Sequence, residues 1–118
     1  MTPQELKDRT KAFAVTIVKF AEELPRDPAT AEIMRQLVRS GTRVGANYRA
    51  SCRAKSRADF ISKMTSAEEE ADETQYWLEI LVDTGTVRRH RAASLLDEAD
   101  EIVRIFVASI NTARRNNR

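Results

Sequence analysis

Few side chains in this sequence could act as nucleophiles or metal ligands. Cys52 is the single cysteine and His90 the single histidine. A nucleophile–base pair would need a thiol or hydroxyl near His90, but we expect Cys52 to be a small packed thiol on the apolar side of its helix. We expect His90, which lies among arginines, to be solvated near the start of the last helix. The acidic run 68–73 covers most of a helix circumference and so does not converge on one ion. We therefore predict no enzyme, no metal site, no cofactor and no small-molecule substrate.

Arginines dominate the middle of the chain. No acidic residue lies between Glu32 and Asp59. Six arginines occur there: Arg35, Arg39, Arg43, Arg49, Arg53 and Arg57. At about 100° per residue on one continuous helix, all six lie within a sector of about 120°. Guanidinium groups bind phosphate in a bidentate manner, so this arginine ridge predicts a nucleic-acid-binding surface.

The segment that follows has the opposite charge, which leaves an alternative open. Between positions 68 and 83 there are acidic residues and no Lys or Arg: Glu68, Glu69, Glu70, Asp72, Glu73, Glu79 and Asp83. If the two segments are neighbouring antiparallel helices, these acids could neutralise the ridge. The alternative function is then a protein–protein adaptor that binds no nucleic acid.

A second surface is expected on the acidic segment. Its apolar seam starts at Phe60, but Tyr76, Trp77 and Ile80 fall well away from that seam. Large aromatic side chains outside the core usually mark a contact surface. We predict that the chain forms a homo-oligomer through Tyr76, Trp77 and Ile80.

Helix signals organise the whole chain into one domain, residues 1–118. Thr2, Asp27 and Ser56 each precede an apolar pattern of helical period, as N-cap residues do. The predicted helices cover residues 3–24, 28–54, 57–84 and 88–114. Their short joints force neighbours to run antiparallel, which predicts an all-α, up-down-up-down four-helix bundle.

Two glycines interrupt the second predicted helix without ending it. The apolar positions on both sides of Gly41 and Gly45 keep the same helical phase, which favours one continuous helix. Each interior glycine costs about 1 kcal/mol relative to alanine. Gly41 and Gly45 therefore either let another helix approach closely or are merely tolerated.

Overall composition adds two expectations. The chain has 20 Lys and Arg against 18 Asp and Glu, a net charge of +2, so the distribution of charge matters more than its sum. No apolar run approaches the ~18 residues of a membrane span, and the start of the sequence lacks the apolar core of a signal peptide. We expect a cytoplasmic protein with no membrane contact.

Three segments resemble a known family: Arg39–Arg49, Ser56–Met64 and Glu70–Leu78. They are similar to bacterial four-helix-bundle proteins first noticed as products of ribosomal-RNA intervening sequences. That family is itself similar to the accessory variability proteins of diversity-generating retroelements. The resemblance implies a homopentameric barrel whose basic surface contacts RNA, DNA or a reverse transcriptase, and it carries over no catalytic motif. Arg43 stands where the family often has serine and Ala50 where it often has glutamate, so this chain is more basic there.

Overall fold

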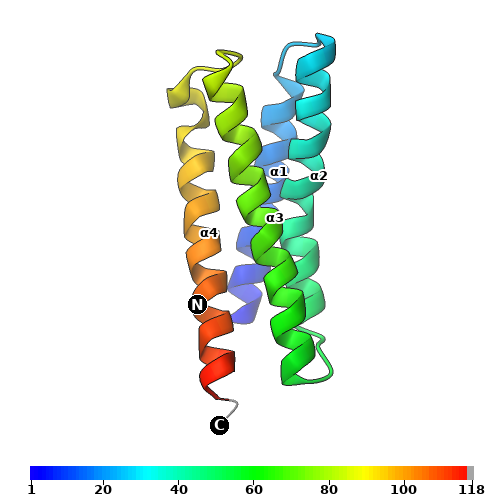
Figure 1. Cartoon of the computed structure of the whole chain (residues 1–118), viewed down its shortest axis with the longest axis vertical. Helices are drawn as coiled ribbons and strands as arrows, with labels where there is room; N and C mark the ends of the chain where they lie inside the picture. The colour runs from blue at the N-terminus through cyan, green and yellow to red at the C-terminus, as the bar shows by residue number, and fades with distance from the viewer. Residues whose placement is uncertain (117–118) are drawn as a thin grey trace.

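The computed structural model describes residues 1–116 and consists of four long helices (Figure 1). They are α1 (Pro3–Glu22), α2 (Pro28–Ser51), α3 (Arg57–Asp83) and α4 (Arg89–Arg115). The helices run alternately up and down and form a rod of 51 × 21 × 20 Å. The prediction of an all-α, antiparallel four-helix bundle is therefore confirmed for one chain. None of the described helices has the apolar length that crossing a bilayer requires.

Side-chain caps fix where the first three helices begin. The Thr2 hydroxyl accepts a hydrogen bond from the Glu5 N–H at 3.1 Å, and the Asp27 carboxylate accepts one from the Thr30 N–H at 3.0 Å. Ser56 caps α3 in the same way. These bonds satisfy donors that the first turn of a helix leaves unpaired. The three predicted N-cap residues are confirmed.

Helix α2 ends earlier than the pattern predicts. It stops at Ser51, three residues before the predicted end, because the N–H groups of Arg53 and Ala54 turn to the carbonyls of Ala50 and Ser51. Such tight bonds close the last turn of a helix. Arg53 therefore lies in the joint between α2 and α3, and Arg57 is the first residue of α3. The prediction that Arg53 extends α2 is wrong, and so is the expectation that one helical ridge includes all six arginines; Arg57 begins α3, as its predicted bounds have it.

The core runs along the inner face of all four helices. Nearly all of the apolar residues that recur at helical spacing along each helix are buried. Ile33 and Phe60, near helix starts, are partly exposed and pack against the core. Tyr48 of α2 and Phe106 of α4 stack across the centre, with ring centroids 5.7 Å apart. The apolar seams, read at helical period, are thus sufficient to locate the core.

Gly41 and Gly45 let α1 pack closely on α2. A Cβ at Gly41 would lie 2.8 Å from Cγ2 of the buried Ile17, and one at Gly45 would lie 3.0 Å from the hydroxyl of Thr10. The first distance is shorter than Cβ contacts in proteins reach, and the second is tight enough that Thr10 would have to shift slightly. The close-approach reading is confirmed, and the approaching helix is α1.

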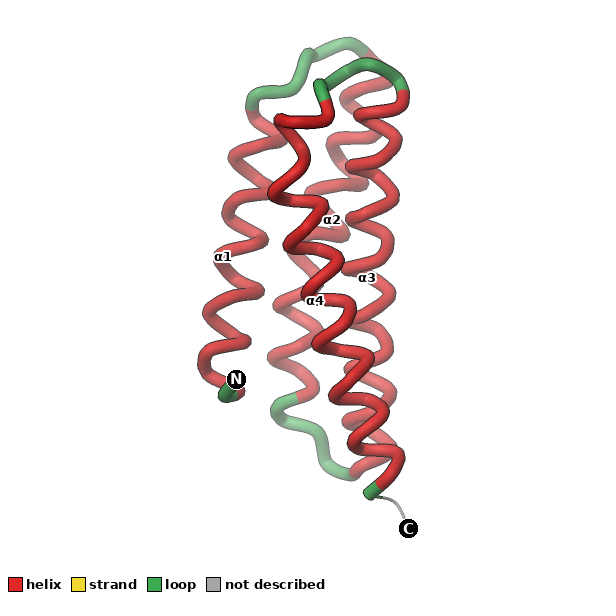
Figure 2. Tube along the Cα trace, turned by 90° about the vertical axis from the view of Figure 1, so that its left-hand side faces the viewer, coloured by secondary structure: helices red, strands yellow, loops and turns green. Residues whose placement is uncertain are grey.

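Ion pairs bridge the sparse contact between α1 and α4. These two helices touch far less than the other neighbouring pairs, and Figure 2 shows α1 standing beside α4 along the rod. The Arg9 guanidinium reaches across to Glu98 at 2.7 Å and to Glu101 at 2.9 Å. The bond to Glu98 is the main reason that the pKa of Arg9 is raised. Near the other end of α1, Arg91 pairs with Glu23 at 2.9 Å.

Candidate nucleic-acid interface

The arginine ridge divides into two parts with different surroundings. All six predicted arginines are exposed, but only Arg35, Arg39, Arg43 and Arg49 belong to α2. Along that helix Arg35, Arg39 and Arg43 turn stepwise toward α3, because residues four apart advance by about 40°. Arg49, six residues after Arg43, lies about 120° back, on the side of α1. Their electrostatic environment changes with this rotation.

Carboxylates already engage the arginines in the first two-thirds of α2. Arg35 is hydrogen-bonded to Glu32, one turn earlier on the same helix. Nη1 of Arg43 lies 3.9 Å from Oε2 of Glu70 on α3, and the charge of Arg39 also acts on Glu70. In this part of the ridge, the acids of α3 therefore contribute one long ion pair, Arg43–Glu70, and Arg35 is paired within α2.

The attraction between Glu70 and the arginines is weak. Burial, followed by the nearby charge of Glu73, raises the pKa of Glu70, and the opposing effects of Arg43 and Arg39 do not cancel this rise. The Glu70 side chain is only 19% exposed, whereas that of Arg43 is 50% exposed. Arg43 therefore remains accessible to another anion.

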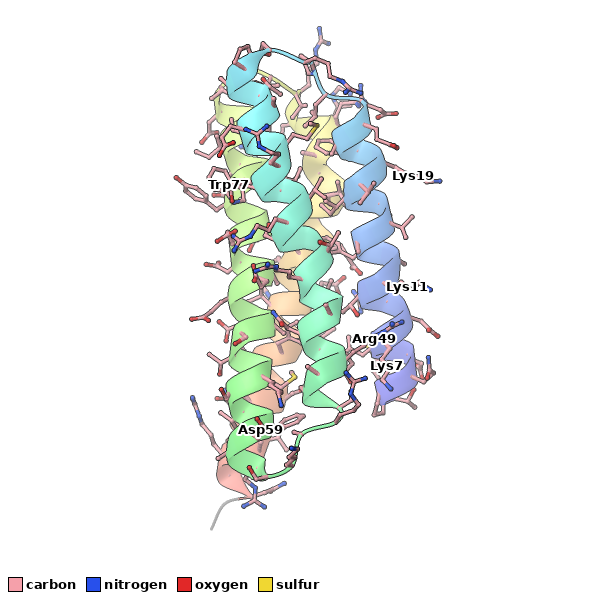
Figure 3. The ribbon with its side chains drawn as sticks, turned by 90° about the vertical axis from the view of Figure 1, so that its right-hand side faces the viewer. Lys7, Lys11, Lys19, Arg49, Asp59 and Trp77 are labelled. Atoms are coloured by element: carbon pink, nitrogen blue, oxygen red, sulfur yellow. The ribbon has the colours of Figure 1, made fainter. Side chains whose placement is uncertain are left out.

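Arg49 lies in different surroundings, beside α1. It lines a hollow of about 190 Å³ between α1 and α2, whose other charged lining residues are Lys7 and Lys11. Figure 3 shows these three residues with Lys19 on one side of the bundle, away from Asp59 and Trp77 of α3. We call Lys7, Lys11, Lys19 and Arg49 the basic face. None of its four members forms an ion pair with a residue in the described range 1–116.

The lysines of the basic face are absent from the sequence prediction. Lys7 and Lys11 are four residues apart, so they share one side of α1. The signal that could have found them is the pair of glycines, because close packing of α1 on Gly41 and Gly45 puts the lysines of α1 beside the last turns of α2. That argument needs the knowledge of which helix approaches the glycines.

The predicted contact surface on α3 is only partly free. Tyr76 is 53% exposed, as predicted, and packs edge-on against Trp77 with ring centroids 5.1 Å apart. Trp77 is half-buried against the core, and its Nε1–H donates to Glu73 at 3.4 Å. Ile80 is also partly buried. The expectation that Trp77 lies away from the core is wrong, because its large ring reaches the flank of the core from an off-seam position.

Cys52 and His90 lie at opposite ends of the rod. Cys52 is the C-cap residue of α2 and is exposed, so the prediction of a packed thiol is wrong. His90 is exposed in the first turn of α4, beside Arg91 and Glu23. A thiol–imidazole pair within one chain is therefore geometrically impossible. The described residues contain no group of three or more His, Cys, Asp or Glu side chains that could hold a metal ion.

Together, fold and surface define an antiparallel four-helix bundle with a basic face on its first two helices. Residues 4–108 match the family model of the 23S rRNA-intervening sequence protein, so the chain belongs to this family. A crystal structure of a protein of unknown function from the S23 ribosomal protein family of Bacteroides thetaiotaomicron is 38% identical, with a TM-score of 0.86. The match covers 94% of this chain and 99% of the other. A comparison with curated proteins finds no match.

Proposed function

We propose that the protein is a non-enzymatic, homo-oligomeric scaffold that binds the phosphate backbone of RNA or DNA through its basic face. The observation that carries the proposal is the convergence of Lys7, Lys11 and Arg49 from two helices around a hollow with no carboxylate in its lining. Cations without internal partners are available to phosphates, whereas those already paired must first give up a carboxylate.

Binding through the basic face is expected to be independent of sequence. Lysine and arginine contacts to phosphates position a nucleic acid but do not read its bases. The hollow offers no aromatic ring for base stacking, since its lining consists of Thr, Ala, Gly, Lys and Arg side chains. Affinity should therefore depend on charge and salt more than on base composition.

A mobility-shift assay with RNA and DNA oligonucleotides tests this function. The double variant Lys11→Ala with Arg49→Ala removes two cations from the basic face and should weaken binding strongly. The control Arg35→Ala with Lys63→Ala removes the same charge from residues that pair with Glu32 and Asp59. Equal losses for the two double variants, or no binding by the wild type at low salt, would overturn the proposal.

Self-association would multiply the basic face in one particle. Tyr76, exposed on α3 beside the half-buried Trp77, supports a contact through this flank, since tyrosine is enriched in protein interfaces. Tyr76→Glu should reduce the mass measured by sedimentation, whereas Val107→Glu, at an exposed apolar position on α4, should not. A monomeric wild type, or an unchanged mass for Tyr76→Glu, would refute this part of the proposal.

A further inference from the structure

The hollow between α1 and α2 has the features of a site for one anion. Its volume of about 190 Å³ is below the ~300–1,000 Å³ typical of sites for drug-sized ligands. The charged groups in its lining are Lys7, Lys11 and Arg49, all cationic. Asp8, which follows Lys7 in sequence, is outside the lining and accepts a hydrogen bond from the Gln4 amide at 3.0 Å.

The floor of the hollow has few free hydrogen-bond donors. Gly45 and Ala46 contribute no polar side chain, and their backbone N–H groups lie within α2. The hydroxyl of Thr10 donates to the carbonyls of Leu6 or Lys7, and that of Thr42 donates to Val38 at 2.7 Å. The donors available to a ligand are therefore the ammonium groups and the guanidinium on the rim.

Close packing at Gly45 holds the rim residues near one another. Thr10 of α1 lies against Gly45, and Lys7 and Lys11 are three residues before and one residue after Thr10. Arg49 is four residues after Gly45, one turn along α2. The rim is thus built on two rigid helices, so an anion would find the cations already gathered and would relieve their mutual repulsion.

We propose that this hollow is a phosphate subsite, in which the Arg49 guanidinium binds one backbone phosphate through two hydrogen bonds while Lys7 and Lys11 supply charge. This inference rests on the proposed function and names the part of the basic face that fixes the position of the backbone. A planar guanidinium matches two phosphate oxygens, whereas an ammonium acts as a point charge. The subsite therefore depends on the identity of Arg49 and not only on its charge.

Two measurements test the subsite separately from nucleic-acid binding. In the first, inorganic phosphate is titrated into the isotope-labelled protein while amide and arginine side-chain signals are followed by NMR. Saturable shifts should be confined to Thr42, Gly45, Ala46 and the Arg49 side chain, and Lys7→Ala should abolish saturation. Lys19→Ala, the matched control on the same helix outside the hollow, should leave the shifts unchanged. Weak shifts at every exposed cation would overturn the subsite.

The second measurement compares Arg49→Lys with Arg35→Lys in polyuridine binding. Arg49→Lys should weaken binding about threefold to tenfold, which corresponds to the loss of one hydrogen bond, without changing the salt dependence. Arg35→Lys, at a position already paired with Glu32, should have no effect. RNA binding that tolerates Arg49→Lys would refute the subsite and leave the proposed function standing. A lack of RNA binding by the wild type would refute the proposed function. The phosphate titration would then still show whether the hollow binds phosphate.

Discussion

Replacing Glu70 by glutamine tests whether α3 restrains the arginines of α2. Oε2 of Glu70 lies 3.9 Å from Nη1 of Arg43, and its charge also meets that of Arg39. Glu70→Gln removes the negative charge and keeps the size of the side chain. Arg43 should then be free to contact phosphate, so we expect RNA binding to become tighter.

The geometry sets the size of this gain. At 3.9 Å and an effective dielectric constant of about 20, the attraction is about 4 kcal/mol before screening. The Arg43 side chain is 50% exposed, so solvent screening reduces the net value to the ~0.2–1 kcal/mol measured for exposed pairs. Release of Arg43 should therefore raise RNA affinity about 1.4-fold to fivefold. It should also steepen the dependence of log affinity on log salt by up to about 0.9.

Glu70→Gln should not lower the free energy of unfolding, because the folded state already disfavours the ionised form of Glu70. The raised pKa of Glu70 means that the destabilising effect of its charge is absent below the ordinary value of 4.5. This effect develops as pH rises from 4.5 through the higher folded value. Urea unfolding at neutral pH should thus show an unchanged or higher free energy of unfolding.

Fluorescence anisotropy with a labelled RNA at two salt concentrations measures the change in affinity. Glu69→Gln is the control, since it alters net charge equally at an exposed neighbouring position. A gain confined to Glu70→Gln is the expected result. Equal gains for both variants, or a loss of affinity in Glu70→Gln, would contradict the view that Glu70 restrains Arg43.

Three further predictions concern the scaffold. Gly41→Ala should lower the free energy of unfolding by up to about 2 kcal/mol in urea titrations, because ~1–3 kcal/mol of crowding against Ile17 opposes the ~1 kcal/mol gain in helix propensity. Thr74→Val removes the buried hydrogen bond from Thr74 to Ser40 and should cost about 1 kcal/mol by the same assay. The pKa of Asp27 is lowered, mainly by the Thr30 N–H, so its stabilising effect is present above 3.8 and is lost as pH falls through the lower folded value. Unfolding followed by circular dichroism should therefore show a smaller loss of stability on acidification in Asp27→Asn than in the wild type.

Local signals made most of the fold predictable. An N-cap such as Ser56 and a buried apolar position such as Leu78 depend on residues within a few turns of the same helix. The local sequence is therefore sufficient to predict them. The sequence does not predict the end of α2, because the helical spacing of apolar residues continues past Ser51 and the hydrogen bonds that close the last turn leave no apolar pattern.

The candidate site was less predictable because it spans two helices. Arg49 was found from the charge pattern of α2, but Lys7 and Lys11 become its neighbours only through the packing of α1 on Gly45. The sequence raised the question of neutralisation without answering it, since the proximity of Arg43 and Glu70 depends on the rotation of both helices.

The salt dependence of RNA affinity in the wild-type protein tests the central claim most directly. If phosphates occupy the basic face, log affinity should fall linearly with log salt, with about 0.7–0.9 of slope for each phosphate contact. Alanine at Lys7, Lys11 and Arg49 together should remove the phosphate contact of the hollow and so reduce that slope by about 0.7–0.9. Affinity that does not respond to salt, or a slope unchanged in the triple variant, would contradict the claim.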